Sequence, residues 1–318
     1  MNPSEKVPHT RAGVWPALAA GRFARTIRCD SREGCQLALL GLPDDTGVRL
    51  NGGRPGAAEG PSALRAALAS FGTTWDGLSE QSLGVRVFDA GDVERAAGDD
   101  EAALFATHAR VEAAVSALLE LGLTPLCVGG GHDLSLPSIS ALSKRLGRPL
   151  GGINVDAHLD VRERVGSGMP FRRLIEGGFV EPRRFVTFGV GRFVNDQRDS
   201  AWLAEQGGSQ LSVEHAGLSD LRPKSVVSHA VAAGEGAFLS VDLDALDASV
   251  MPGVSALNPA GLSVTQVATL VEAAAISPGI RHFDLMELSP PWDPSGRSAR
   301  VAAYLLLCFV AGFARRPR

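Results

Sequence analysis

The chain lacks several features that identify whole classes of protein. Its 318 residues carry a formal net charge of −4, so there is no basic surplus of the kind that binds nucleic acid. The first thirty residues contain no continuous apolar stretch typical of a signal peptide, and the longest apolar run, 301–313, is too short to cross a bilayer. No Ser/Gly-rich linker or charge block divides the chain. We therefore expect one cytoplasmic domain with no nucleic-acid or membrane partner.

Cysteine is also scarce, and its spacing argues against a paired redox or metal motif. The four cysteines form no Cys-x-x-Cys pair. Cys127 and Cys308 lie in apolar runs, so we expect buried, reduced thiols. Cys29 and Cys35 are near enough in sequence to pair, but no other feature indicates that they do.

Short apolar runs do alternate with longer helical patterns from residue 36 onward. Hydrophobic residues make up 45% of the chain and charged residues 21%, which is ordinary for a globular protein. The expected strands are 36–41, 85–89, 124–128, 150–155, 184–189, 210–213, 237–241 and 280–285. The expected helices are 60–70, 101–121, 136–146, 196–205, 224–233, 264–275 and 299–313. This alternation is typical of a parallel sheet covered on both faces. We expect a single three-layer α/β/α domain, residues 36–318, with an eight-stranded, mostly parallel sheet and an N-terminal extension, residues 1–35.

Metal-competent side chains follow two of the expected strands. Asp156, His158 and Asp160 follow one strand at a spacing of two residues, and Asp242 and Asp244 follow another. In an extended strand, residues two apart point to the same face, so these side chains converge. Buried carboxylates are rare unless they are paired or bind a metal, because an unpaired charge in a low-dielectric interior is costly. One aspartate could simply cap a helix, but the two clusters together predict a metal site.

Two further strand ends carry candidate residues. His132 follows the three glycines 129–131, and Glu287 follows the last expected strand. The glycine turn has neither the G-x-x-x-x-G-K-[ST] nor the G-x-G-x-x-G pattern of a phosphate-binding loop. Ligands of open parallel sheets bind outside the carboxyl ends of the strands, where all these residues would gather. Glu287 would suit a cationic substrate group such as an amidinium, although each of the two residues taken singly also fits a structural or surface role.

The predicted ligands comprise two imidazoles and four carboxylates, which is more than one tetrahedral zinc ion takes. They are His132, Asp156, His158, Asp160, Asp242 and Asp244. So many carboxylates favour two Mn²⁺ ions, with Ni²⁺, Co²⁺ or Fe²⁺ as alternatives. Two such cations would lower the pKa of a shared water and direct it at an sp² carbon. Hydrolysis is the predicted reaction class.

These residues resemble the motifs of the ureohydrolase superfamily, which includes the arginases, agmatinases and formimidoylglutamases. The resemblance runs from about Leu37 to Leu307 and is carried by Gly-Gly-Gly-His-Asp at 129–133, Asp-Ala-His-Leu-Asp at 156–160 and Ser-Val-Asp-Leu-Asp-Ala-Leu-Asp at 240–247. It implies an arginase-like fold and a homo-oligomer. It also implies one metal on His132, Asp156, Asp160 and Asp242, and the other on Asp156, His158, Asp242 and Asp244. Glu287 matches the acid that meets the cationic end of the substrate in this superfamily.

Within the superfamily the chain is most similar to the formimidoylglutamase branch, through residues 47–61, 167–172 and 252–259. Enzymes of this branch split N-formimidoyl-L-glutamate into glutamate and formamide during histidine breakdown. A substrate with two carboxylates calls for basic residues, and Arg49, Arg54, Arg172 and Arg173 lie on nearby loops. The substrate-binding residues that we expect are Arg172, Arg54 and Asn258.

The chain also departs from the superfamily pattern. Arginases and agmatinases carry a proton-shuttling histidine beyond the Asp-x-His-x-Asp motif, and residues 162–174 contain none. Its absence weighs against those two activities and leaves the proton donor to the leaving group open. Ala248 and Asp133 replace residues that are common in the superfamily, but neither change removes a ligand. The alternatives are a guanidino-acid hydrolase of the arginase, agmatinase or guanidinobutyrase type, which releases urea, and a metal-binding regulatory protein without turnover. The intact ligand set favours an enzyme.

Overall fold

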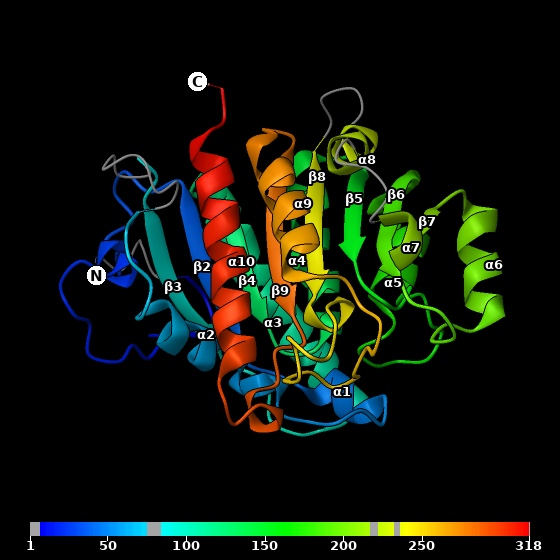
Figure 1. Cartoon of the computed structure of the whole chain (residues 1–318), viewed down its shortest axis with the longest axis horizontal. Coiled ribbons are helices and arrows are strands. Elements are labelled where there is room, and N and C mark those ends of the chain that lie inside the picture. Colours follow the sequence, from blue (N-terminus) through cyan, green and yellow to red (C-terminus); the bar gives the residue numbers. More distant parts are fainter. Residues whose placement is uncertain (1–6, 75–83, 217–221, 232–235, 318) are drawn as a thin grey trace.

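A nine-stranded sheet forms the centre of the computed structural model, which describes residues 7–74, 84–216, 222–231 and 236–317. The strand order is β1-β3-β2-β4-β9-β8-β5-β6-β7, which Figure 1 shows from β3 to β7. The strands are β1 (Thr10–Arg11), β2 (Leu37–Leu42), β3 (Val87–Val93), β4 (Thr124–Gly129), β5 (Leu150–Val155), β6 (Val180–Val190), β7 (Ser209–Ser212), β8 (Ala237–Asp242) and β9 (Ile280–Met286). All neighbouring pairs are parallel except β1 with β3.

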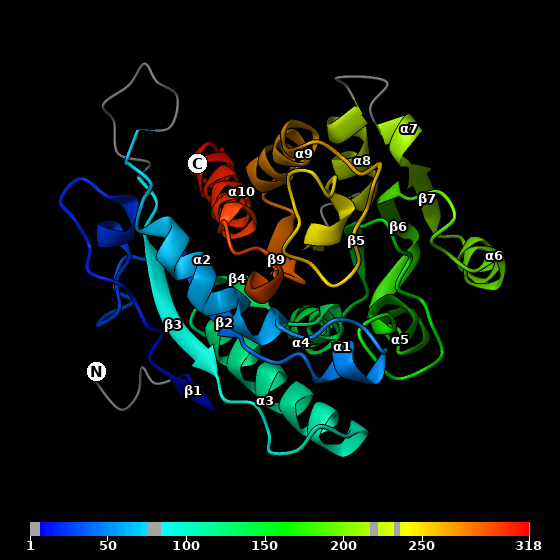
Figure 2. The same cartoon turned by 60° about the horizontal axis from the view of Figure 1, so that its bottom comes forward.

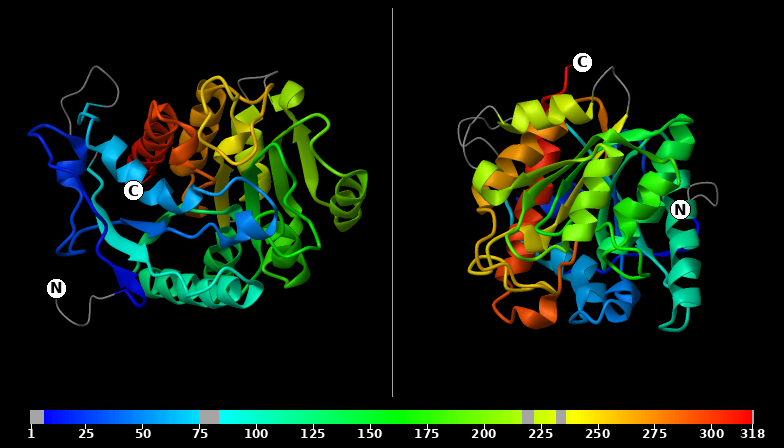
Figure 3. Two further views of the ribbon diagram at one scale, coloured as in Figure 1. Left: turned by 90° about the horizontal axis from the view of Figure 1, so that it is seen from below. Right: turned by 90° about the vertical axis from the view of Figure 1, so that its right-hand side faces the viewer.

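Helices cover both faces of the sheet and complete three layers (Figure 2). One face carries α2 (Gly60–Leu68), α8 (Arg222–Ala230), α9 (Val264–Ile276) and α10 (Arg297–Ala314). The other carries α3 (Glu101–Glu120), α4 (Ser135–Leu146) and α5 (Pro170–Glu176). The remaining helices are α1 (Thr46–Leu50), α6 (Gln197–Gln206) and α7 (Val213–Ala216). The dark-blue N-terminal segment and the yellow-green α6 lie at opposite ends of the sheet (Figure 3).

The expected α/β/α architecture is confirmed, but the sheet has nine strands rather than eight. The extra strand, β1, pairs through two residues only, which is too short to leave a hydrophobic pattern in the sequence. β3 extends to Val93 rather than ending at Asp89, because its acidic residues are neutralised by a buried arginine of α2.

The expected helix 224–233 corresponds to α8, and residues 232 and 233 lie outside the described part of the chain.

Residues 7–35 pack on the domain that they precede. Trp15 Nε1 donates a hydrogen bond to Asp89 Oδ2 at 2.6 Å, and Phe23 and Ile27 are buried in the main core. The domain boundary at residue 36 stays a prediction. All four cysteines are free, with Cys127 buried and Cys308 partly exposed.

Two helices, α3 and α10, are long and apolar enough to span a membrane by length and composition alone. Both pack on the sheet: Val111 and Val115 of α3 and Leu305 and Phe309 of α10 are buried in the core. Their apolar character is therefore accounted for by the packing of the domain.

Candidate metal centre and substrate cavity

Four neighbouring strands, β4, β9, β8 and β5, carry the predicted metal ligands and Glu287 at or just beyond their carboxyl ends. The pairing register aligns these ends, because Leu285 of β9 lies beside both Val128 and Val241, and Val241 lies beside Val155. The residues that follow therefore emerge at one level, at the lower edge of the sheet in Figure 1. His132 N, for example, donates a hydrogen bond of 3.0 Å to Glu287 Oε1 across 155 residues of sequence.

The first ligand group, which we call the His132 group, consists of His132, Asp156, Asp160 and Asp242. His132 Nδ1 lies 3.3 Å from Asp156 Oδ2, 2.9 Å from Asp160 Oδ2 and 3.2 Å from Asp242 Oδ2. All four residues are buried. One ring nitrogen thus faces three carboxylate oxygens, and none of these contacts has hydrogen-bond geometry.

The second ligand group, the His158 group, consists of Asp156, His158 and Asp244. His158 Nδ1 lies 3.4 Å from Asp156 Oδ1 and 3.2 Å from Asp244 Oδ2. Asp156 belongs to both groups and presents one oxygen to each, which is the arrangement of a bridging ligand. Asp242, the other expected bridge, presents Oδ2 to His132, while its Oδ1 accepts a hydrogen bond of 2.8 Å from Asp244 N.

The crowding of these acids shifts their protonation. Burial raises the pKa of Asp242 well above its usual range, and the charges of Asp244 and Asp156 act in the same direction. Burial also raises the pKa of Asp160 and of Asp244. For His132, burial acts to lower the pKa, but the three carboxylates in contact with its ring outweigh it and raise the pKa well above its ordinary value. Without a cation, the groups would therefore have to share protons.

The donor set fits a pair of divalent cations. His132 Nδ1 and Asp244 Oδ1 are buried without a hydrogen-bond partner, and a metal ion would satisfy such atoms. Imidazole nitrogens and carboxylate oxygens in these proportions suit Mn²⁺ among first-row metals. Asp156 would serve both ions, because its two oxygens lie in different groups.

Buried polar residues behind the site orient the His132 ring. Its Nε2 lies 2.9 Å from Ser240 Oγ, and Ser240 in turn donates to Asp284 Oδ1. Asp284 Oδ2 accepts from Ser135 Oγ at 3.0 Å and lies 3.0 Å from His282 Nε2. Since Ser240 donates its proton to Asp284, its oxygen is left to accept from His132 Nε2–H. That tautomer leaves Nδ1 unprotonated and able to bind a metal.

Glu287 occupies an unusual backbone conformation beside these ligands. Its φ is +66°, a left-handed value that costs a non-glycine residue free energy, and its own N–H donates to Gly130 O at 2.8 Å. Gly130 is required there, because a Cβ at this position would lie 1.8 Å from Asp44 O. Glu287 Oε2 is buried without a partner. Burial, with the charge of Asp244, raises the pKa of this carboxyl to about 8.

A cavity of about 290 Å³ opens onto the ligands. Its metal-facing end is formed by His158, Asp160, Asp242, Asp244 and Glu287. The rest is lined by Asn51, Gly52, Gly53, Arg54, Arg162, Ser167, Ser255 and Ala256. The cavity therefore has an acidic end and a wall that carries two arginines.

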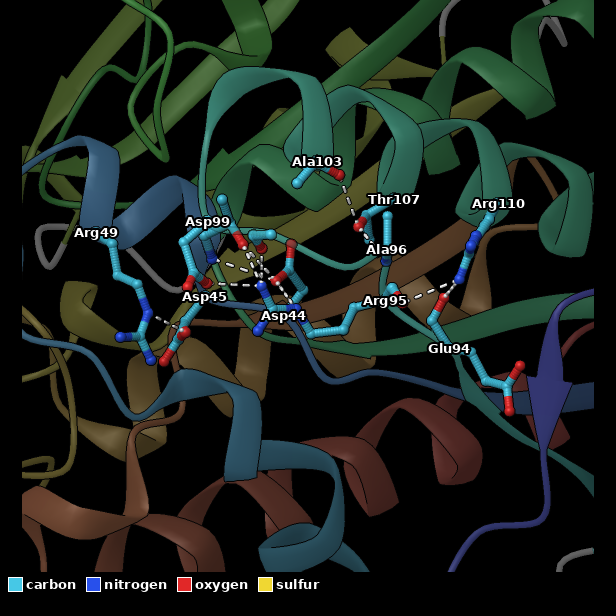
Figure 4. Close-up of polar contacts among 12 residues, drawn as sticks. Asp44, Asp45, Arg49, Glu94, Arg95, Ala96, Asp99, Ala103, Thr107 and Arg110 are labelled. Carbon is cyan, nitrogen blue, oxygen red and sulfur yellow. Dashed lines mark hydrogen bonds and ion pairs between the residues drawn. The ribbon is translucent and has the colours of Figure 1, made fainter.

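The loop after β2 supplies four residues of the cavity lining, Asn51 to Arg54. Two buried aspartates, Asp44 and Asp45, hold this loop in place (Figure 4). Asp44 Oδ1 lies 3.2 Å from Arg95 Nε. Asp45 accepts a hydrogen bond from Arg49 Nε at 2.9 Å and another from Gly56 N at 2.6 Å, so it spans the loop. Arg49, one of the arginines on nearby loops, is thus paired with Asp45 and is not among the residues that line the cavity.

The three predicted substrate-binding residues lie in different places. Arg54 lines the cavity, and its guanidinium donates to Val254 O and Ser255 O. Arg172 is not among the lining residues; it pairs with Glu163 and Glu176, each at 2.9 Å. Asn258 is buried away from the cavity lining, with Oδ1 accepting from Ala260 N at 3.3 Å.

Sequence reasoning did not single out Arg162, which lines the cavity and donates from Nη1 to Asn51 Oδ1 at 3.2 Å. A signal for it was present, because Arg162 continues the two-residue spacing of Asp156, His158 and Asp160. Ser167, which also lines the cavity, lies at the start of a segment that the resemblance did single out.

Comparisons with known proteins agree with this geometry. The chain is 36% identical over 307 residues to a formimidoylglutamase of Aeromonas hydrophila, covering 94% of this chain and 90% of that protein. A Trypanosoma cruzi formiminoglutamase solved with Mn²⁺ superposes with a TM-score of 0.81 at 33% identity, covering 91% of this chain and 97% of the other. Proclavaminate amidino hydrolase from Streptomyces clavuligerus gives a TM-score of 0.81 at 25% identity, covering 94% and 98% of the two chains. The family model described as the arginase family matches residues 35–312, a span that contains every predicted ligand, and the chain belongs to that family.

Proposed function

We propose that this protein is a formimidoylglutamase, which hydrolyses N-formimidoyl-L-glutamate to L-glutamate and formamide with two Mn²⁺ ions per chain. The observation that carries the proposal is the pair of adjoining ligand groups at one end of a cavity whose wall carries arginines. The relatives that are about 35% identical to this chain support the proposal, because they match most of its length and are named formimidoylglutamase. We place the protein in the cytoplasm as a homo-oligomer.

Six residues would hold the ions. The His132 group would bind one, and the His158 group together with Asp242 would bind the other, with Asp156 and Asp242 shared. When bound, the ions would act as Lewis acids and lower the pKa of a water held between them. Ser240 contributes by holding the tautomer of His132 that leaves Nδ1 free to bind.

The chain's own side chains would orient the substrate between the two ends of the cavity. Glu287, with a carboxylate oxygen that has no partner, would accept hydrogen bonds from the amidinium group at the acidic end. Arg162 and Arg54 lie on the wall, where a guanidinium would pair with the glutamate carboxylates. Hydrolysis breaks the bond between the formimidoyl carbon and the glutamate nitrogen, and water supplies the oxygen of formamide.

The test is an assay of the purified, manganese-loaded protein with formimidoylglutamate, arginine, agmatine and guanidinobutyrate in parallel. We expect formamide from the first and no urea from the others. The likeness to proclavaminate amidino hydrolase makes a guanidino-acid hydrolase the second candidate. Urea from any guanidino compound, with no formamide from formimidoylglutamate, would establish that candidate and reject the proposal.

A further inference from the structure

Asn195 lies on the loop between β6 and α6 and contacts the backbone on both sides of His158. Its Nδ2 donates a hydrogen bond to Ala157 O, and its Oδ1 accepts one from Leu159 N, each at 2.9 Å. A reversed amide would set its NH₂ group against an N–H and its oxygen against a carbonyl, so the two bonds fix the orientation of the side chain. Asn195 thus bridges the two residues that flank His158.

The segment around His158 lies beyond the end of β5 and needs support from outside the sheet. Asp156 N still donates to Phe188 O at 3.0 Å, in continuation of the pairing of β5 with β6. The next contacts come from the β6–α6 loop, where Gly191 N donates to Ala157 O at 2.9 Å. Beyond Asp156, the β6–α6 loop rather than β6 itself therefore supplies the backbone that contacts this segment.

The two imidazoles of the metal centre are held in different ways. His132 is held through its ring, by Ser240, and its side chain is 1% exposed. The His158 side chain is 19% exposed, and within the described residues no side chain bonds to its Nε2. Apart from the carboxylates that its Nδ1 faces, the His158 ring is therefore held through its backbone, which Asn195 contacts on both sides and whose own N–H donates to Asp156 Oδ1 at 2.7 Å.

We propose that Asn195 is a positioning residue for the metal ion of the His158 group. It fixes the peptide groups next to His158, so that Nδ1 stays directed toward Asp156 and Asp244. This inference rests on the proposed function, because it requires a metal ion at that position. Asn195 also links the His158 segment to α6, because the next residue, Asp196, is the N-cap of that helix.

Titration of metal-free protein with Mn²⁺ by isothermal calorimetry tests the inference. We expect wild type to bind two ions, and Asn195→Ala to weaken one of them by about 10- to 100-fold while the other is unchanged. The matched control is Gln36→Ala. Gln36 also makes two backbone hydrogen bonds, to Gly34 O at 2.9 Å and from Arg86 N at 3.0 Å, but at the amino end of β2. We expect this variant to bind both ions as wild type does.

A double-variant cycle identifies the affected site. If Asn195 acts through His158, then Asn195→Ala combined with His158→Ala loses no more affinity than His158→Ala alone. Hydrogen exchange of the Leu159 amide in metal-free protein should also become faster in Asn195→Ala, because its acceptor is gone. If the alanine variant does not fold, Asn195→Leu keeps the volume and removes both hydrogen bonds, and the same loss is expected.

Two results would overturn the inference: wild-type affinity for both ions in Asn195→Ala, or equal weakening of both ions together with a lower Tm of the metal-free protein. The second result would mean that Asn195 has only a general structural role. Failure of the proposed function is distinguishable, because it would appear in the wild type as fewer than two bound Mn²⁺ or as no formamide.

Discussion

Two acidic residues of the site adopt left-handed backbone conformations that non-glycine residues rarely take. Asp160 has a φ of +51° and Glu287 a φ of +66°. Such conformations cost on the order of 1–3 kcal/mol each and persist only where the surroundings enforce them. Here the enforcing bonds are those from Phe171 N to Asp160 O and from Glu287 N to Gly130 O. The strain therefore lies where the carboxylates must be directed at the cavity.

The cavity wall predicts that Arg162, rather than Arg172, governs substrate affinity. Arg162→Met removes a cation that lines the cavity, so we expect KM for formimidoylglutamate to rise about 10- to 100-fold with a smaller change in kcat, since a hydrogen bond to a charged group contributes about 1.5–3 kcal/mol. Arg172→Met is the matched variant, because Arg172 is occupied by Glu163 and Glu176 outside the lining. We expect its KM to stay within about twofold of wild type. Steady-state kinetics of both variants measures the two KM values. A large rise of KM in Arg172→Met with little change in Arg162→Met would instead identify Arg172 as the binding residue.

At the scale of elements, the sequence predicted most of the strands and helices and missed several of the shortest ones. The apolar strands β2, β4, β5, β8 and β9 were predicted to within two residues at either end. α1 and α5 were missed because five and seven residues are too few for a helical period to be recognised. β1 was missed because its two residues pair with β3 only through contacts distant in the sequence.

A buried ion pair joins α2 to β3, and we expect its removal to destabilise the fold strongly. Arg65 is 1% exposed and lies 2.9 Å from Asp89 Oδ1 and 2.6 Å from Asp92 Oδ1. Arg65→Met would leave two buried carboxylates without a cation, which costs about 3–5 kcal/mol in comparable cases. Chemical denaturation at pH 7 measures the loss. The control is Arg198→Met, which removes an exposed pair with Asp196 and should leave the free energy of unfolding unchanged. Equal stability of the two variants would contradict the expectation.

On the scale of the whole molecule, the buried acids of the candidate metal centre couple stability to pH. Burial raises the pKa of Glu287 from 4.5 to about 8, and burial and neighbouring acids raise that of Asp242 as well. Between pH 5 and 8 the unfolded chain has lost the Glu287 proton while the metal-free fold keeps it, so the unfolded state binds fewer protons and stability falls as pH rises; the raised pKa of Asp242 acts in the same direction. One such group contributes a slope of up to about 1.4 kcal/mol per pH unit.

Thermal melts from pH 5 to 8, with and without Mn²⁺, test this coupling. We expect the Tm of metal-free protein to fall with pH and the stabilisation by Mn²⁺ to grow, because ligands must lose their protons to bind a metal. Glu287→Gln should flatten the metal-free profile, since its amide does not titrate. A metal-free Tm that rises through this pH range would contradict the raised pKa values of Glu287 and Asp242.

The gathering of the six candidate ligands at one edge of the sheet could be predicted from the sequence, because they follow apolar strands, most of them at a spacing of two residues. The positions of Arg162 and Arg172 could not, because both lie on the connection after β5 and its path determines which one faces the cavity. The contact of Asn195 with the His158 segment was equally hidden, since it joins residues 36 to 38 positions apart, beyond the ends of β5 and β6. The strand order, which places β9 between β4 and β8, is likewise a property of the folded sheet.

That strand order also bears on how the chain reaches its folded state. β9 is the last strand in the sequence, yet it fills the gap between β4 and β8, so the two halves of the sheet cannot join until residue 286 is available. His132 belongs to one half, and Asp156, His158, Asp160, Asp242 and Asp244 belong to the other. We therefore expect the two ligand groups to come together only after β9 has left the ribosome, so that a metal ion would bind late in synthesis or after it.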